Sequence, residues 1–102
     1  MRIVAAVVKP PGPAPEHERV LVLNRTYASI DLTGWRLATD SGSATLAATA
    51  PPADAVAIAL PAEVPLSNKG GRINLLDPSG LKIHGVAYTA DQAAREDRLV
   101  SF

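Results

Sequence analysis

A turn followed by the only tryptophan constrains this chain most strongly. Residues 30–37 read IDLTGWRL, so that Trp35 directly follows Gly34 at the start of a strand-like run. Glycine permits a sharp reversal of the backbone, and the reversal brings the large apolar ring into the next strand. We therefore expect two strands joined by a tight turn, with Trp35 buried between two layers of β-sheet.

A second turn is predicted at residues 77–80, which read DPSG. Asp, Pro and Gly occupy the positions that a type I turn prefers, and such turns in hairpins usually carry a glycine bulge. In the bulged register, Asp77 opposes Leu81 and Leu75 opposes Ile83. The apolar face of this hairpin then consists of Ile73, Leu75, Ile83 and Ala87, and the opposite face carries Asn74 and His84.

The remaining chain alternates short strand-like runs with turns rich in Gly and Pro. Strands are predicted at residues 2–8, 18–24, 35–39, 44–49 and 55–60. The run at 44–49 has small side chains and is predicted to lie at a sheet edge. Closely spaced strands without helical periodicity favour an all-β sandwich. A chain of 102 residues has the size of one domain, so we expect a single domain over residues 1–102.

The end of the chain has a different character. Thr89, followed three residues later by Gln92, forms a capping-box pattern, and alanines and charged residues come next. We expect one or two helical turns there. A short strand or an apolar plug is then predicted from Leu99, Val100 and Phe102.

Charge and cysteine content exclude several classes of function. Ten basic and ten acidic side chains cancel, so the chain lacks the long-range field that draws proteins to nucleic acids or anionic membranes. Without cysteine, neither a disulfide nor a thiolate metal site can form. No run is long enough to cross a membrane as a helix. We expect a cytoplasmic protein without membrane insertion.

Three segments in order resemble a known family. They are the strand 18–24 that ends in Asn24, the turn and strand 30–37, and the hairpin 73–88 that ends in Val-x-Tyr. Together they resemble the lamin tail domain, an immunoglobulin-like β-sandwich found in nuclear lamins and in many bacterial proteins. The resemblance implies this fold, with no cofactor and no catalytic residue. The chain departs from the family pattern at Arg19, usually aromatic, and at His84, usually Asp.

The tail at residues 87–96 is similar to the ends of YukJ-like bacterial proteins. That family pairs an uncharacterised domain with a lamin-tail-like domain. The similarity implies an accessory or interaction module, either the C-terminal part of a larger protein or a stand-alone relative.

Catalytic and metal sites are weakly supported by the residues. Ser67, Asp77 and His84 contain the groups of a hydrolytic triad, but the sequence around Ser67 resembles neither a nucleophile elbow nor an oxyanion loop. His17 stands beside two glutamates without the ligand spacing of zinc proteins. We therefore expect no enzyme activity, no cofactor and no metal.

The candidate binding residues are cationic or exposed. Lys69 and Arg72 flank two glycines and, with Lys82, are predicted to form a small basic patch. Arg95 and Arg98 either extend this patch or pair with nearby acidic residues. The loop 67–72 has backbone N–H groups for a phosphate or carboxylate, although a hairpin turn is the favoured interpretation. Tyr27 is predicted to be exposed in a loop. Residues 24–26 match a glycosylation sequon, which carries no weight without a secretory signal.

Two functions follow as hypotheses. The first is a non-catalytic module that mediates protein contact or attaches an associated domain, with the edge strand from Ala44 to Thr49 open to strand addition by a partner or another copy. The alternative is binding of nucleic acid or another anionic polymer through Lys69, Arg72 and Lys82.

Overall fold

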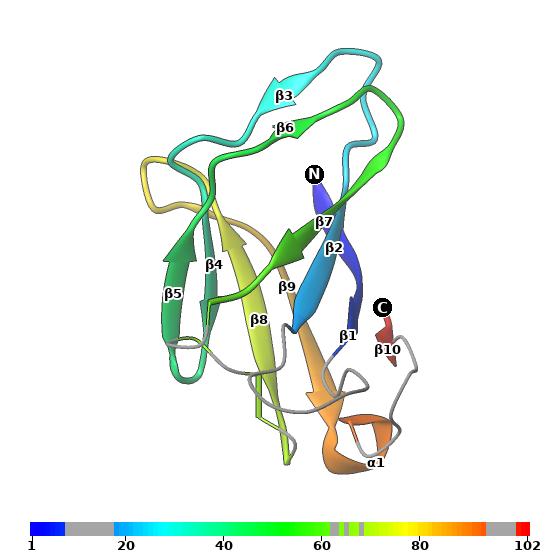
Figure 1. Cartoon of the computed structure of the whole chain (residues 1–102), viewed down its shortest axis with the longest axis vertical. Helices are drawn as coiled ribbons and strands as arrows, with labels where there is room; N and C mark the ends of the chain where they lie inside the picture. The colour runs from blue at the N-terminus through cyan, green and yellow to red at the C-terminus, as the bar shows by residue number, and fades with distance from the viewer. Residues whose placement is uncertain (8–17, 62–63, 65, 68, 94–99) are drawn as a thin grey trace.

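The computed structural model describes residues 1–7, 18–61, 64, 66–67, 69–93 and 100–102. Strands predominate among these residues, and one short helix, α1 (Ala90–Ala93), follows the last long strand. The strands form two four-stranded antiparallel sheets and one two-stranded sheet (Figure 1). The all-β, sandwich-like class that the sequence predicts is therefore confirmed.

The first four-stranded sheet has the order β10-β1-β2-β7. These strands lie close to the predicted positions and are β10 (Val100–Ser101), β1 (Arg2–Val7), β2 (Arg19–Leu23) and β7 (Ala55–Ala59). Alternation in β2 buries Val20 and Val22 completely, whereas Leu21 and Leu23 are partly exposed on the other face. The burial of β2 thus alternates with a period of two.

The second four-stranded sheet has the order β5-β4-β8-β9. Its strands are β5 (Gly42–Thr45), β4 (Arg36–Thr39), β8 (Gly70–Leu76) and β9 (Lys82–Thr89). The two-stranded sheet pairs β3 (Ile30–Asp31) with β6 (Thr49–Ala50).

The single strand predicted at residues 44–49 is wrong. The chain leaves the second sheet after β5 and pairs with β3 only from β6 onward. Backbone bonds continue across the gap, because the Leu46 N–H donates to the Trp35 carbonyl at 2.7 Å and the Leu32 N–H donates to the Ala48 carbonyl at 2.8 Å. The prediction of a sheet edge is right for β5, which is the last strand of its sheet.

Both four-stranded sheets contribute to one core. Its largest completely buried apolar side chains are Ile3, Val20 and Val22 from the first sheet, Leu37, Ile73 and Leu75 from the second, and Leu32. Trp35 is only partly buried and packs against this cluster, so the prediction that it fills the interior is wrong. The turn that begins at Leu32 explains the difference, because Leu32 takes the inner place while Trp35 covers the rim of the core.

The β8–β9 hairpin begins as predicted and then changes register. The Asp77 N–H donates to the Leu81 carbonyl at 3.0 Å, and Gly80 adopts a positive φ of 89°, as in a type I turn with a glycine bulge. Ile83 is then an extra residue, since Leu76 opposes Lys82 while Leu75 opposes His84. The predicted pairing of Leu75 with Ile83 is therefore wrong.

This second bulge exchanges the faces of β9. His84, Val86 and Tyr88 share the inner face with β8 residues such as Ile73. Ile83 is 39% exposed and Ala87 is exposed, contrary to the prediction that both join the apolar face. No local sequence signal marks this bulge, because Lys82, Ile83 and His84 all suit a regular strand.

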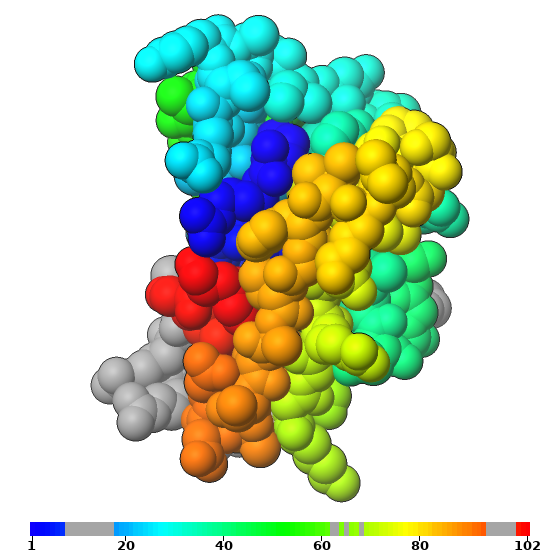
Figure 2. Space-filling view, turned by 180° about the vertical axis from the view of Figure 1, so that it is seen from behind, coloured from blue at the N-terminus to red at the C-terminus, as the bar shows by residue number. Residues whose placement is uncertain are grey.

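The predicted capping box is confirmed at the start of α1. The Thr89 N–H donates to Gln92 Oε1 at 2.8 Å, and the Gln92 N–H donates to Thr89 Oγ1 at 3.3 Å. The predicted terminal strand is present as β10, which pairs with β1. Figure 2 shows β10 in red directly beside β1 in blue, with β9 in orange along both.

Candidate functional site

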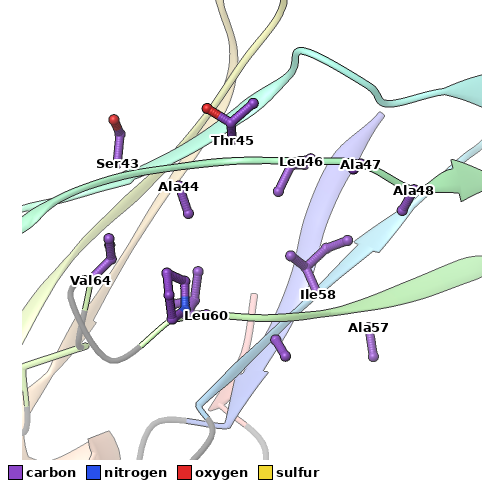
Figure 3. Close-up of a pocket in the computed structure, with 12 residues that line it drawn as sticks. Ser43, Ala44, Thr45, Leu46, Ala47, Ala48, Ala57, Ile58, Leu60 and Val64 are labelled. Carbon is purple, nitrogen blue, oxygen red and sulfur yellow. The ribbon is translucent and has the colours of Figure 1, made fainter.

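A groove of about 700 Å³ opens between residues 43–48 and the segment that begins in β7. Figure 3 shows Leu46, Ile58, Leu60 and Val64 directed toward this space. The other lining residues are small or polar, and none of the twelve carries a charge. The groove is therefore an apolar, uncharged concave surface of a volume typical of ligand sites.

One wall of the groove is the unpaired edge of β7, the last strand of the first sheet. The Asn24 N–H donates to the Asp54 carbonyl at 2.9 Å, and the Leu60 N–H donates to the Glu18 carbonyl at 2.8 Å. Hydrogen-bonded pairs alternate in an antiparallel ladder, so the backbone of Ala57 and Ala59 is directed away from β2. In the described part of the chain, no strand pairs with this outer edge.

The opposite wall is the edge of β5 and the residues that follow it. The Leu46 N–H donates to the Trp35 carbonyl, and this bond determines which residues of β5 direct their backbone groups toward β4. By the same rule, Ser43 and Thr45 direct their backbone N–H and C=O groups away from β4. The groove therefore lies between two sheet edges whose outward backbone groups pair with no other strand in the part of the chain that the structure describes.

The predicted basic patch is only partly assembled. Arg72 opposes Ala87 and Lys82 opposes Leu76, so both cations lie on the outer face of the hairpin, about 13 Å apart along the strands. Lys69 lies in the turn that precedes β8. Arg36 also opposes Leu76, from β4, so it lies in the same row as Lys82. Sequence reasoning missed Arg36, because only the register of β4 against β8 brings it to this face.

Lys82 lies across the outer face rather than away from it. If residue 85 had a Cβ, this atom would lie 2.6 Å from Lys82 Cε and 2.9 Å from its Nζ. Glycine at position 85 therefore leaves the space that the lysine side chain occupies.

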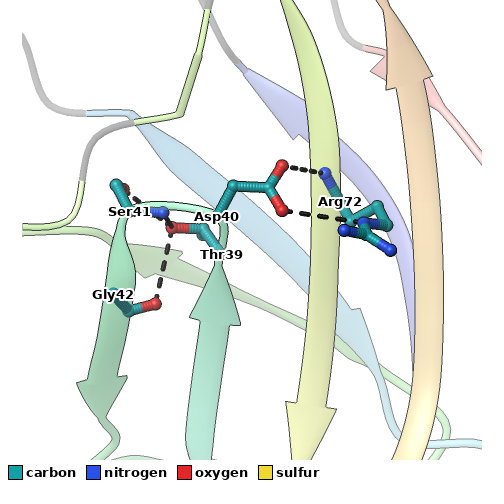
Figure 4. A network of polar contacts seen from close by, with 5 residues as sticks. All are labelled: Thr39, Asp40, Ser41, Gly42 and Arg72. Atoms are coloured by element: carbon teal, nitrogen blue, oxygen red, sulfur yellow. Dashed lines mark hydrogen bonds and ion pairs between the residues drawn. The ribbon is translucent and has the colours of Figure 1, made fainter.

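Arg72 has an acidic partner that the sequence did not reveal. The Arg72 N–H donates to Asp40 Oδ2 at 3.1 Å, and Arg72 Nε lies 3.6 Å from Asp40 Oδ1 (Figure 4). Both side chains are exposed, so the ion pair contributes little to stability, but the carboxylate reduces the positive potential at Arg72.

The residues of the considered triad do not meet. Ser67 precedes β8 and Asp77 follows it, so the length of the strand, about 23 Å, separates them. Asp77 accepts hydrogen bonds from the Ser79 hydroxyl and from the Ser79 and Leu81 N–H groups, and the bond from this hydroxyl lowers the pKa of Asp77. His84 Nδ1 accepts a bond from the Ile3 N–H. Each group thus has a structural role.

Ser67 belongs to a small polar pocket beside Tyr88. The Tyr88 hydroxyl donates to the Ser67 carbonyl at 2.6 Å. Burial of the phenol, together with the negative charges of Glu18 and Asp40, raises the pKa of Tyr88 to about 12. The pocket has a volume of about 150 Å³, much smaller than the groove.

Tyr27 is 96% exposed, as predicted. The loop that carries it is joined to the turn before β7, because the Ala53 N–H donates to the Thr26 carbonyl at 2.9 Å. Ala53 adopts a positive φ of 51°, a conformation that L-residues other than glycine, Asn and Asp adopt rarely. Tyr27 lies outside the groove lining.

The sequon at residues 24–26 is a structural turn. Asn24 is completely buried, and its amide donates to the carbonyls of Ala28, Ala50 and Pro51. Its Oδ1 accepts bonds from the N–H and the hydroxyl of Thr26. Asn24 thus joins the end of β2 to the loop and to the chain after β6. Sequence reasoning missed this role, although Asn-x-Thr also marks an Asx turn.

Several predicted residues, including His17, Arg95, Arg98 and Leu99, lie outside the described residues. Within the described part, no group of three or more His, Asp or Glu side chains is arranged to hold a metal ion. A helix with the length and apolar character needed to cross a membrane is likewise absent from that part.

Comparisons with known proteins leave the family open. No family model matches the chain, and neither a curated protein nor a solved structure matches it. The resemblance to the lamin tail domain therefore depends on the three sequence segments alone.

Proposed function

We propose that the chain is a non-catalytic interaction module with an immunoglobulin-like sandwich of the lamin-tail type. It binds a protein partner, or attaches an associated domain to one, through the groove between β5 and β7. The observation that carries this proposal is an apolar groove of about 700 Å³ between two uncharged strand edges, neither of which pairs with a further strand among the described residues.

Edges of this kind are unusual on a soluble protein. Sheet edges are normally protected by charged side chains, proline or bulges, because unpaired strands recruit other chains. β5 reads GSAT and β7 reads AVAIA, so neither strand carries a charge or a proline. The absence of protection fits an edge whose partner is another protein.

The non-catalytic part of the proposal is supported by the roles of the candidate catalytic groups. Asp77 stabilises a turn, His84 joins two strands, and the Ser67 carbonyl accepts a bond from Tyr88. Hydrolytic chemistry would need a nucleophile, a base and an orienting acid within hydrogen-bond reach of one another.

The test compares two adjacent substitutions. Both alanines line the groove, but Ala48 is half-buried and packs against the core cluster, whereas the neighbouring Ala47 is exposed, so that a longer side chain there can stay in water. The tagged chain, purified from its source cells, is expected to retain a partner as wild type and as Ala47→Glu. Ala48→Glu is expected to lose it, because a carboxylate in the apolar groove would be desolvated. Equal recovery by both folded variants would contradict the proposal.

Binding of an anionic polymer is the second candidate. It is favoured by the position of Arg36 and Lys82 in one row of the outer face, although Asp40 partly neutralises Arg72. Retention on heparin is then expected to weaken with salt and to fall in the double variant Arg36→Ala/Lys82→Ala. The control Lys69→Ala/Arg72→Ala is expected to lose less. Absent retention at low salt would remove this candidate.

A further inference from the structure

We propose that the groove binds an extended, uncharged segment of a partner protein, which adds to the outer edge of β7 as an antiparallel strand. The proposal rests on the proposed function and specifies the site, the binding mode and the chemistry of the partner.

The hydrogen-bonding groups of β7 define where the segment binds. The Ala55 N–H already donates to Asp54 Oδ1 at 2.8 Å, and the Pro61 carbonyl accepts a bond from Val64 at 3.0 Å. Proline also has no N–H to donate. Among the described residues, the groups between these limits that no other residue uses are the N–H and C=O of Ala57 and Ala59. An antiparallel strand therefore makes two bonds with each of these residues.

The groove determines which side chains the segment carries. Residues that face each other in an antiparallel pair lie on the same face of the sheet. The partner residue opposite Ile58 is therefore directed into the groove, toward Leu46 and Leu60. It is expected to be apolar, because none of the described residues that line the groove has a charged side chain to compensate a buried charge. Its two neighbours lie opposite Ala57 and Ala59 on the outer face, where β-branched residues suit a strand.

A second copy of this chain fits the site less well. Two β7 strands could pair around a two-fold axis through Ile58, so that Ala57 of each copy faces Ala59 of the other and the same backbone groups are used. Such a contact would involve about five residues from each chain, against roughly 20–30 a side in a stable interface. A single extended segment can reach both the edge and the groove.

The probe is the peptide acetyl-TVTVTVT-amide, added to the ¹⁵N-labelled chain. The amide signals of Ala57 and Ala59 are expected to shift, and their hydrogen exchange is expected to slow about tenfold as these groups become bonded. N-methylation of the third and fifth residues, both Thr, removes donors that face β7 and is expected to abolish binding. N-methylation of the second and fourth residues, both Val, leaves those donors in place and is expected to preserve it.

A variant of the protein gives an independent measurement. Ala57→Pro removes the backbone N–H that would donate to the peptide, and it is expected to weaken peptide binding about tenfold. The fold is expected to survive, because proline is tolerated on an edge strand where its nitrogen faces outward. Circular dichroism checks that the variant is folded.

Three results would overturn the proposal. The first is that the Ala57 and Ala59 signals do not change at millimolar peptide, and the second is that the two N-methylated peptides bind equally. The third is that the same signals shift with protein concentration in the absence of peptide, which would identify a second copy as the occupant. If the peptide fails while Ala48→Glu still releases a partner, the proposed function stands and only strand addition fails. If Ala48→Glu releases nothing although the peptide binds, the proposed function fails instead.

Discussion

His84 Nδ1 accepts a hydrogen bond from the backbone N–H of Ile3 at 3.0 Å, and this bond joins β9 of one sheet to β1 of the other. The bond requires a neutral imidazole, since a protonated Nδ1 cannot accept. Burial lowers the pKa of His84, and the positive charges of Arg2, the N-terminus and Lys82 lower it further. The two sheets are thus joined by a bond that protonation of this imidazole would break.

Acid should weaken this connection. The pKa of His84 is lower in the folded chain than its ordinary value of 6.5, so the unfolded chain binds a proton that the folded chain resists. The stabilisation is therefore complete above pH 6.5 and is lost as the pH falls through the lowered pKa. Urea unfolding followed by Trp35 fluorescence should show a decreasing free energy of unfolding between about pH 7 and 5.

Two substitutions separate the bond from the charge. His84→Asn keeps an acceptor near the Nδ1 position but does not titrate, so its stability should depend less on pH over this interval. His84→Ala leaves the Ile3 N–H without its acceptor and should cost about 1–3 kcal/mol at pH 7.5. The same pH slope in wild type and His84→Asn would contradict the assignment.

Substitution of Asn24 should reduce the stability of the fold more than substitution of most other polar residues. Asn24→Ala removes the partner of three carbonyl groups and of Thr26, and should destabilise the chain by about 2–4 kcal/mol in thermal unfolding. Asn24→Asp is nearly isosteric, yet it directs a carboxylate oxygen toward those three carbonyls. It should therefore be at least as damaging at pH 7 and recover in acid. A stable Asn24→Asp variant at pH 7 would argue against the network.

The Tyr88 hydroxyl should ionise at a higher pH than an ordinary tyrosine, and it should stabilise the fold until the pH becomes strongly alkaline. The absorbance at 295 nm should show one tyrosine that ionises near pH 12, and this step should be absent in Tyr88→Phe. Because its folded pKa is raised above the ordinary 10.0, its contribution is complete below pH 10.0 and is lost as the pH rises through about 12. Loss of the bond to Ser67 in Tyr88→Phe should cost about 1 kcal/mol at pH 7.

A matched pair of isoleucines tests the register of the hairpin. Ile83→Thr should change stability by no more than about 0.5 kcal/mol, because the bulge leaves this side chain exposed. Ile73→Thr makes the same chemical change at a completely buried position and should cost about 2–4 kcal/mol. Similar costs in chemical denaturation would indicate that Ile83 faces the core and that the simpler register is correct.

Local sequence signals predicted much of the architecture. The Asp77 turn and the Thr89 capping box follow from interactions between residues at most four positions apart, and both are present. The positions of β1, β2 and β7 likewise lie close to the strands that the sequence predicts at residues 2–8, 18–24 and 55–60. The candidate site could not be predicted from the sequence, because the groove is formed by two chain segments on different sheets.

The sequence by itself determined where strands, turns and the helix cap lie, since these depend on the conformational preferences of neighbouring residues. Tertiary structure alone decided that Ile83 bulges outward, that Asp40 pairs with Arg72 and that β5 and β7 leave their edges open. The physical reason is that register, ion pairing and edge exposure depend on which distant strands pack together. A strand sequence constrains the alternation of its faces but not the identity of its neighbour.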